Sequence, residues 1–134
     1  MDYGARSCIM QSQRASQEEC SMESQLEVWN EYLKLRDQSQ ELMPDLIGIK
    51  NALTGEAYKE GVLSTKVKRL MGLTVGLRAG CKYCIVGQTM LALQAGATKE
   101  EIFETLAVAT AMGGTPGLSE SFRVVQLLGE LGKL

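Results

Sequence analysis

Histidine is absent from this 134-residue chain. Every thiol in the sequence therefore lacks its usual general base, and a zinc site would have to be built without imidazole. An excess of basic residues is also missing, because 14 Lys and Arg stand against 16 Asp and Glu and the net charge is -2. This balance excludes the basic surface that nucleic-acid-binding proteins present.

Long apolar runs are missing as well. Gly, Thr, Gln or a charged residue interrupts every apolar stretch, so none approaches the roughly 18 consecutive apolar residues of a membrane span. The first residues lack the basic start and the apolar centre of a signal peptide. We therefore expect a soluble, cytoplasmic protein that binds neither nucleic acid nor membrane. The chain has the length of one domain.

Strand-like alternation is absent, and the apolar residues follow helical spacing, which predicts an all-α fold. Residues 1–21 are polar and are expected to form a disordered or loosely attached tail before a single domain at 22–134. About six helices are predicted in this domain. Their approximate ranges are 26–43, 44–53, 64–80, 81–94, 98–112 and 118–134.

Capping residues and helix breakers set the predicted helix ends. Ser64 is a natural N-cap and Gly80 a natural C-cap of the helix between them, and Thr98 with Glu101 has the spacing of a capping box. The dipeptide at 54–55, Thr-Gly, is expected to interrupt the helix that begins at Pro44.

Two helices carry distinctive apolar patterns. In helix 64–80 one face is predicted to contain Val67, Leu70, Met71, Thr74 and Leu77. Helix 98–112 is apolar on most sides, which is typical of a helix packed between others or in a subunit interface. A homo-oligomer is therefore expected.

Cys81 and Cys84 form a Cys-x-x-Cys motif at the start of the predicted helix 81–94. Thiols at this spacing can form a disulfide, and the positive end of the helix stabilises a thiolate. Cys8 and Cys20 lie in the polar tail, so in a reducing compartment the pattern favours a redox pair over a disulfide framework. An inert, buried pair is the alternative. A zinc site would have to borrow the two tail cysteines or ligands from another chain.

Gln88 follows Cys84 by one helical turn and is predicted to lie on the same stripe of the helix. An amide can form hydrogen bonds, but it cannot accept the thiol proton as a base near neutral pH. The residues therefore supply a nucleophile and a candidate orienting group without a proton relay. A solvated surface glutamine is the alternative.

Two further motifs flank the cysteines. They are L-S-x-K-x-K-R-L-M at 63–71 and G-x-T-x-E-E-I at 96–102. Together with Gly80-Cys81-x-x-Cys84, and with Gly114-x-Pro116 further on, they resemble the carboxymuconolactone decarboxylase and alkylhydroperoxidase D-like family over about residues 44–131. A thioredoxin-like protein would instead need a strand before its Cys-x-x-Cys motif.

The resemblance implies an all-helical protomer that assembles into homotrimers or homohexamers. We expect that no metal or organic cofactor is required. In this family the second cysteine usually attacks, so Cys84 would be the nucleophile and Cys81 the resolving thiol. The family has a Glu and a His where this chain has Arg69 and Gln88, so both members of the relay are replaced. Arg69 is expected to stabilise the Cys84 thiolate by its charge, unless it faces solvent on a basic surface of its helix.

We therefore expect dithiol–disulfide cycling that reduces a small hydroperoxide or a partner disulfide, with electrons from an unidentified thiol or disulfide donor. A non-catalytic helical oligomer of the same family and a redox-sensing module are the alternatives. The decarboxylase branch of the family typically lacks the cysteine pair, which makes that activity a poor match.

Overall fold

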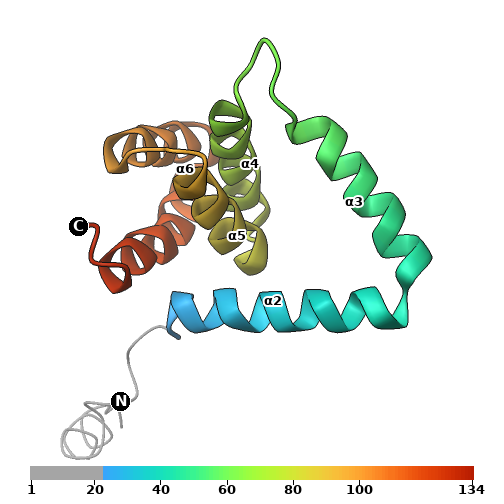
Figure 1. Cartoon of the computed structure of the whole chain (residues 1–134). Helices are drawn as coiled ribbons and strands as arrows, with labels where there is room; N and C mark the ends of the chain where they lie inside the picture. The colour runs from blue at the N-terminus through green and yellow to red at the C-terminus, as the bar shows by residue number, and fades with distance from the viewer. Residues whose placement is uncertain (1–22) are drawn as a thin grey trace, which may run out of the picture.

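The structure, a computed structural model, describes residues 23–134. The tail predicted at 1–21, with Cys8 and Cys20, lies outside the described residues. The described part is all-α, as predicted, and contains no strand. Its helices are α2 (Gln25–Leu42), α3 (Pro44–Tyr58), α4 (Thr65–Ala79), α5 (Lys82–Gln94) and α6 (Lys99–Glu130) (Figure 1).

The last two predicted helices are the two segments of α6. The backbone of Gly114 leaves the helical region, with φ 63° and ψ -151°, and Pro116 follows it inside the same long element. Gly117 lets the two segments pack closely, because a Cβ at this position would lie 2.6 Å from the carbonyl oxygen of Ala109. The predicted turn is therefore a sharp bend within one continuous element.

A bundle of α4, α5 and the two segments of α6 encloses the main core (Figure 1). Its buried side chains are Leu73, Leu77, Ile85, Ala92, Ala97, Ile102, Leu106, Ala109, Val124 and Leu128. The first half of α2 packs on this bundle through Val28 and Trp29, which contact Val86 and Leu127 in a second cluster. None of the described helices is both long and apolar enough to cross a membrane.

The predicted helix caps are present. The Ser64 hydroxyl accepts a hydrogen bond from the Val67 amide, and Gly80 ends α4 in the left-handed conformation with φ 64°. Thr98 and Glu101 form the reciprocal capping box at the start of α6. These ends depend on local side-chain chemistry, which is why the sequence specifies them.

The prediction that Thr54-Gly55 interrupts the second helix is wrong, because α3 continues to Tyr58. The Thr54 hydroxyl donates to the carbonyl oxygen of Lys50 at 2.8 Å, so its polar group is satisfied within the helix. A glycine inside a helix costs only about 1 kcal/mol relative to alanine. A single weak position is therefore not enough to end the helix.

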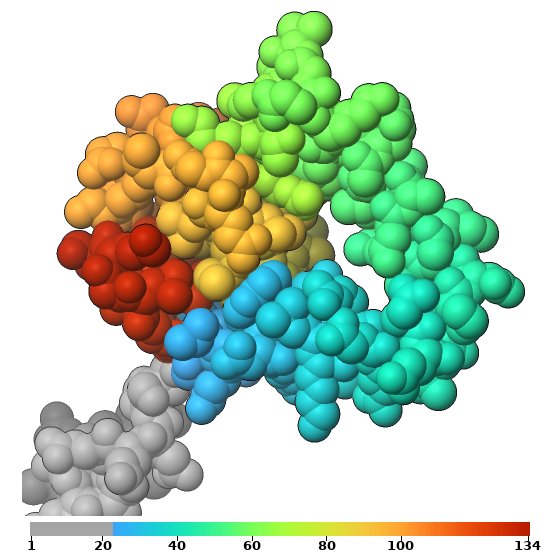
Figure 2. Space-filling model, viewed as in Figure 1, coloured from blue at the N-terminus to red at the C-terminus, as the bar shows by residue number. Residues whose placement is uncertain are grey.

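The second half of α2 and all of α3, residues 35–58, extend away from the bundle, and we call them the arm. No residue of α3 is buried. Leu46, Ile49 and Leu53 are 60%, 71% and 70% exposed. Figure 2 shows a hollow between the arm and the bundle. The end of α3, at Tyr58, returns to the bundle beside α4.

Candidate functional site

The two cysteines of the motif lie where α5 begins. Cys81 is the N-cap residue of α5 and Cys84 lies in its first turn. They are joined by a disulfide with the Cα atoms 5.2 Å apart. The amide of Cys84 donates to Sγ of Cys81 at 3.3 Å. Cys84 is exposed, whereas Cys81 is half-buried.

Gly76 holds this turn against α4. A Cβ at position 76 would lie 3.3 Å from Cβ of Cys84 and 3.3 Å from the amide nitrogen of Ile85. The amide of Cys81 also donates to the carbonyl oxygen of Gly76 at 3.1 Å. The absence of a side chain at Gly76 thus lets α4 approach the backbone of the cysteine turn and fix its position.

Cys84 lies at the wall of a cavity of about 300 Å³ between α4 and α5, with the end of α3 at one side. The cavity is lined by Tyr58, Gly72, Val75, Gly76, Ala79, Cys84 and Gln88. Cys84 and Gln88 therefore share one cavity, consistent with their position on one stripe of α5. Most of the remaining lining is small or apolar.

Arg69 and Gln88, the two residues expected to stabilise a thiolate or orient a substrate, lie together. Nη1 of Arg69 donates to Oε1 of Gln88 at 3.4 Å. The guanidinium carbon of Arg69 also lies 3.7 Å from the centroid of the Tyr58 ring, in a cation–π contact. Arg69 is half-buried between these two partners and is not a solvated residue of a basic surface.

The neighbouring lysines of α4 point elsewhere. Lys66 forms an ion pair with Glu101 of α6 at 2.6 Å, and Lys68 donates to the carbonyl oxygen of Lys59 at 2.7 Å. The hydrogen bond from Lys66 is the main reason that the pKa of Glu101 lies below its usual value. Arg69 is thus the cation of this segment that contacts residues of the cavity.

Tyr58 and Gly72 belong to the site and were missed in the sequence. A Cβ at position 72 would lie 2.6 Å from the Tyr58 hydroxyl and 3.0 Å from Cδ of Gln88. Gly72 therefore makes room for both side chains. Tyr58 carries no recognisable motif, and the helix that presents it was predicted to end at Leu53.

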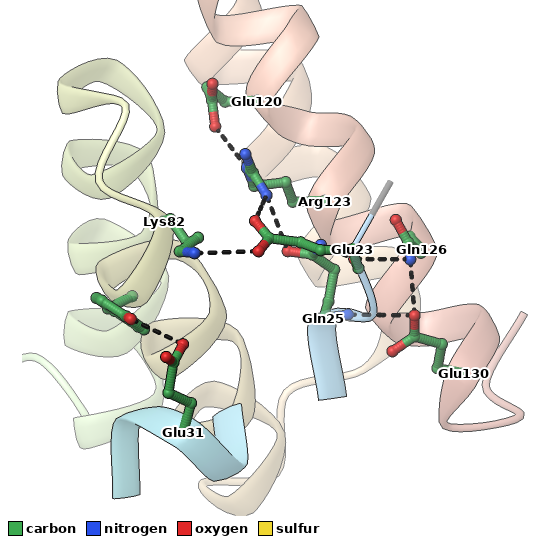
Figure 3. Close-up of polar contacts among 9 residues, drawn as sticks. Glu23, Gln25, Glu31, Lys82, Glu120, Arg123, Gln126 and Glu130 are labelled. Atoms are coloured by element: carbon green, nitrogen blue, oxygen red, sulfur yellow. Dashed lines mark hydrogen bonds and ion pairs between the residues drawn. The ribbon is translucent and has the colours of Figure 1, made fainter. Parts of the chain in front are cut away.

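The two residues between the cysteines face α2 and the segment before it. Lys82 forms an ion pair with Glu23 at 3.1 Å, and the Tyr83 hydroxyl donates to Glu31 at 2.8 Å (Figure 3). The hydrogen bond with Glu23 raises the pKa of Lys82, and the hydrogen bond with Glu31 raises the pKa of Tyr83. The motif is therefore held by polar contacts on the side away from the cavity.

Further polar contacts join α6 to the start of α2 (Figure 3). Arg123 binds Glu23 at 3.1 Å and Glu120 at 3.0 Å. Glu130 accepts hydrogen bonds from the amides of Leu26 at 2.7 Å and Gln25 at 3.2 Å. Within residues 23–134, no group of three or more His, Cys, Asp or Glu side chains is placed to hold a metal ion.

Comparison with known sequences relates the chain to one family. The profile of the carboxymuconolactone decarboxylase family matches residues 46–127. An uncharacterized protein of Cupriavidus necator is 38% identical over 61 residues, which are 46% of this chain and 54% of that protein. The uncharacterized protein 4 in the cox locus of Paracoccus denitrificans is 29% identical over 80 residues, 60% of this chain and 72% of that protein.

Solved structures with the same architecture come from the same family. Apo-lpg0406 of Legionella pneumophila, a carboxymuconolactone decarboxylase family protein, matches with a TM-score of 0.77 and 26% identity over 84% of this chain and 100% of its own. TM1620 of Thermotoga maritima, a family member suggested to act in an antioxidative response, matches with a TM-score of 0.69 and 30% identity, covering 78% of this chain and 89% of its own.

Proposed function

This chain belongs to the carboxymuconolactone decarboxylase family, and we propose that its Cys81–Cys84 pair cycles between dithiol and disulfide to reduce a hydroperoxide or a partner disulfide. One observation carries the proposal: an exposed cysteine at the wall of a cavity lies within disulfide distance of a second, half-buried cysteine. A structural pair buried in the core would offer no such access to a substrate.

Cys84 is proposed as the attacking thiol. The helix dipole alone would favour a thiolate at Cys81, which is closer to the N-terminus of α5. Substrate access favours Cys84 instead, because Cys84 lines the cavity and is exposed, whereas Cys81 is half-buried. Cys81 then serves as the resolving thiol.

With a hydroperoxide, the Cys84 thiolate attacks the terminal oxygen, so that an S–O bond forms and the O–O bond breaks. The leaving alkoxide takes up a proton, and Cys84 becomes a sulfenic acid. The Cys81 thiolate then attacks the Cys84 sulfur, the disulfide forms, and the departing hydroxide takes up a proton to become water. The dithiol has supplied two electrons, and an external thiol restores it.

Arg69 is proposed to favour the reactive thiolate without acting as a base. A guanidinium stays protonated and cannot accept the thiol proton, but its charge stabilises a nearby anion. Arg69 is anchored beside the cavity by Gln88 and Tyr58. Charge would thus replace the proton relay that the family builds from Glu and His.

We also propose that the protein assembles with copies of itself, as a trimer or hexamer. The exposed leucines and isoleucine of the arm and the exposed Val108 and Met112 of α6, at 57% and 82%, form more apolar surface than a monomer ordinarily leaves in water. Light scattering at micromolar concentration measures the mass of the particle. A monomer would contradict this proposal.

The redox proposal is tested by intact mass spectrometry of the reduced protein before and after one equivalent of hydroperoxide. We expect the loss of two hydrogens, confined to the peptide that carries Cys81 and Cys84. Cys84→Ser should abolish turnover, whereas Cys81→Ser should leave a sulfenic acid or a mixed disulfide on Cys84. Equal turnover in the two variants would contradict the assigned order of attack.

A cysteine pair that remains reduced in the presence of both hydroperoxide and a disulfide reagent would instead favour the non-catalytic oligomer.

A further inference from the structure

The proposed reaction needs a proton at one atom, the oxygen that leaves when the O–O bond breaks. An alkoxide is a poor leaving group, so an acid placed beside it accelerates the step. The chain contains no histidine, and the Glu position of the family motif is occupied by Arg69. The question is which side chain of the cavity can give this proton.

We propose that the Tyr58 hydroxyl is this proton donor. The cavity would then bind a hydroperoxide as its substrate, in preference to a partner disulfide. This inference rests on the proposed function. Tyr58 and Cys84 line the same cavity. Among the described residues that line the cavity, Gln88 is not an acid, so Tyr58 carries the acidic proton there besides the cysteine itself.

Gly72 and Arg69 are the neighbours of the Tyr58 side chain in the cavity. The Tyr58 hydroxyl lies where the missing side chain of Gly72 leaves space, 2.6 Å from a Cβ built there. The Tyr58 ring is held by the Arg69 guanidinium at 3.7 Å. Within residues 23–134 the hydrogen bond at Tyr58 involves its backbone carbonyl oxygen, which accepts from the Thr65 hydroxyl at 2.9 Å, and the Tyr58 hydroxyl has no protein partner. A hydroxyl that has no protein partner and lines the same cavity as the nucleophile is available to donate to a substrate.

The Arg69 guanidinium also supports the transfer itself. Once the phenol has given up its proton, the ring and its oxygen carry a negative charge, and a cation against the ring face stabilises that charge. Oε1 of Gln88 accepts from Arg69, so the amide N–H groups of Gln88 are the ones left to orient a substrate oxygen. The Tyr58 hydroxyl and the Gln88 amide can therefore both donate hydrogen bonds to a substrate, and no side chain among the described residues of the cavity acts as a base.

The step balances as follows. The Cys84 thiolate forms the S–O bond as the O–O bond breaks, the alkoxide takes the Tyr58 proton and leaves as an alcohol, and a tyrosinate remains. The tyrosinate regains a proton from solvent as the Cys81 thiol gives one up and attacks the sulfenic sulfur. Hydroxide leaves and is protonated to water.

The test uses Tyr58→Phe, which keeps the ring and its contact with Arg69 and removes only the hydroxyl. Three reagents are compared in single-turnover reactions of the reduced protein. The leaving alkoxide of tert-butyl hydroperoxide needs a proton, whereas the acetate from peracetic acid and the iodide from iodoacetamide do not. We expect the rate with tert-butyl hydroperoxide to fall about 10²-fold, and the other two rates to stay within about twofold of wild type.

Two further variants sharpen the result. Tyr32→Phe, which removes the hydroxyl of a tyrosine stacked on Trp29 at 5.5 Å and away from the cavity, is the matched control and should change none of the rates. Gly72→Ala places a Cβ 2.6 Å from the Tyr58 hydroxyl and 3.0 Å from Cδ of Gln88, so it should lower the rate with tert-butyl hydroperoxide further than the rate with iodoacetamide, although the hydroxyl is still present.

Equal rates of Tyr58→Phe and wild type with tert-butyl hydroperoxide would overturn the assignment. A parallel loss with all three reagents would overturn it as well, because it would place the effect of Tyr58 on the thiolate and not on the leaving oxygen. Wild-type protein that reacts with iodoacetamide but with neither oxidant would refute the proposed peroxide reduction, and with it this inference.

Discussion

The glycines of the arm and those of the bundle have opposite surroundings. In α3, Gly48 and Gly55 have no atom within 4 Å of where a Cβ would stand. In the bundle, a Cβ at Gly72, Gly76 or Gly117 would lie between 2.6 and 3.3 Å from a neighbour. In the bundle, glycine thus allows neighbouring helices to pack closely. In the arm of the isolated protomer no neighbouring element packs against the glycines, and they only lower the stability of the helix.

The large apolar residues repeat this contrast. Helices α3 and α4 are both 15 residues long. Leu73 and Leu77 of α4 are fully buried, whereas Leu46 and Leu53 of α3 are 60% and 70% exposed. Two helices of equal length and comparable apolar content therefore have different roles. The bundle supplies the stability of the protomer, and the arm presents a surface that the protomer itself does not cover.

The largest effect is expected from truncating matched leucines in the two regions. Leu77→Ala removes a fully buried side chain from the core and should lower the free energy of unfolding by about 3 kcal/mol. Leu53→Ala should change it by no more than about 0.5 kcal/mol in the monomer. Urea denaturation at low protein concentration measures both, and equal losses would remove the distinction between the regions.

The next largest effect concerns the bend of α6. Gly117→Ala places a Cβ 2.6 Å from the backbone oxygen of Ala109. Because a backbone atom cannot move aside as a side-chain end can, we expect a loss of about 2 kcal/mol. Thermal unfolding followed by circular dichroism gives the value. An unchanged melting temperature would mean that the two segments of α6 are not packed as described.

A third prediction concerns Arg69, where the arm and the bundle meet through Tyr58. Arg69→Glu replaces a cation beside the cavity with an anion, so the pH midpoint of Cys84 alkylation should rise by about one unit, equivalent to about 1.4 kcal/mol. Rates of iodoacetamide alkylation as a function of pH give this midpoint. Identical midpoints for wild type and variant would rule out the electrostatic role.

The double variant Arg69→Glu with Gln88→His extends this experiment. It restores the two residue types of the family's relay, and it should recover more peroxidase activity than either change alone, because a base and its orienting carboxylate act as a unit.

A smaller effect of opposite sign is expected in the arm. Gly48→Ala adds a methyl group in open space on a helix, so it should stabilise the protein by about 0.5 to 1 kcal/mol. Melting temperatures of wild type and variant, both measured as monomers, test this. If the same substitution weakens a homo-oligomer, then Gly48 lies at a close contact between copies, and the arm is the surface that they share.

The smallest effect is a pH dependence at the junction of α2 and α6. Burial opposes ionisation of Glu130, but hydrogen bonds from Leu26, Gln126, Gln25 and Ser24 outweigh it and place its pKa below the usual 4.5. The stabilising contribution is therefore present above the unfolded value and is lost as the pH falls through the folded one. Glu130→Gln should lower the melting temperature near neutral pH, and the difference from wild type should shrink below pH 4.5. A difference that is constant with pH would contradict this origin.

Local features of the fold could be predicted from the sequence. Ser64, Gly80 and the Thr98–Glu101 box act through hydrogen bonds or backbone freedom within one turn of the chain, and the cysteine pair acts at a fixed spacing. Each of these features is contained in a few consecutive residues. The all-α class could also be predicted, because the apolar residues follow helical spacing without strand alternation. The expected order of attack came from the family resemblance, since the residues alone left it open.

Features set by distant segments could not be predicted. Val67 and Met71 were assigned to the apolar face of α4, yet they are 38% and 54% exposed. They line a groove beside α6, while Leu73 is buried instead. A helix with apolar residues on several sides does not specify which side faces inward; that choice depends on where glycines such as Gly76 admit a neighbouring helix. Tyr58 was missed for the same reason, because only the fold brings it to Cys84.

The two ends of α6 contact different helices, and these contacts affect how fast the amide hydrogens of α6 exchange with solvent. At one end Glu101 pairs with Lys66 of α4, and at the other Glu130 accepts from the first amides of α2. Fraying from either end must therefore break a link between helices. We expect the buried amides of the two α6 segments, away from the bend at Gly114, to exchange deuterium far more slowly than those of α3, which should exchange through brief local openings.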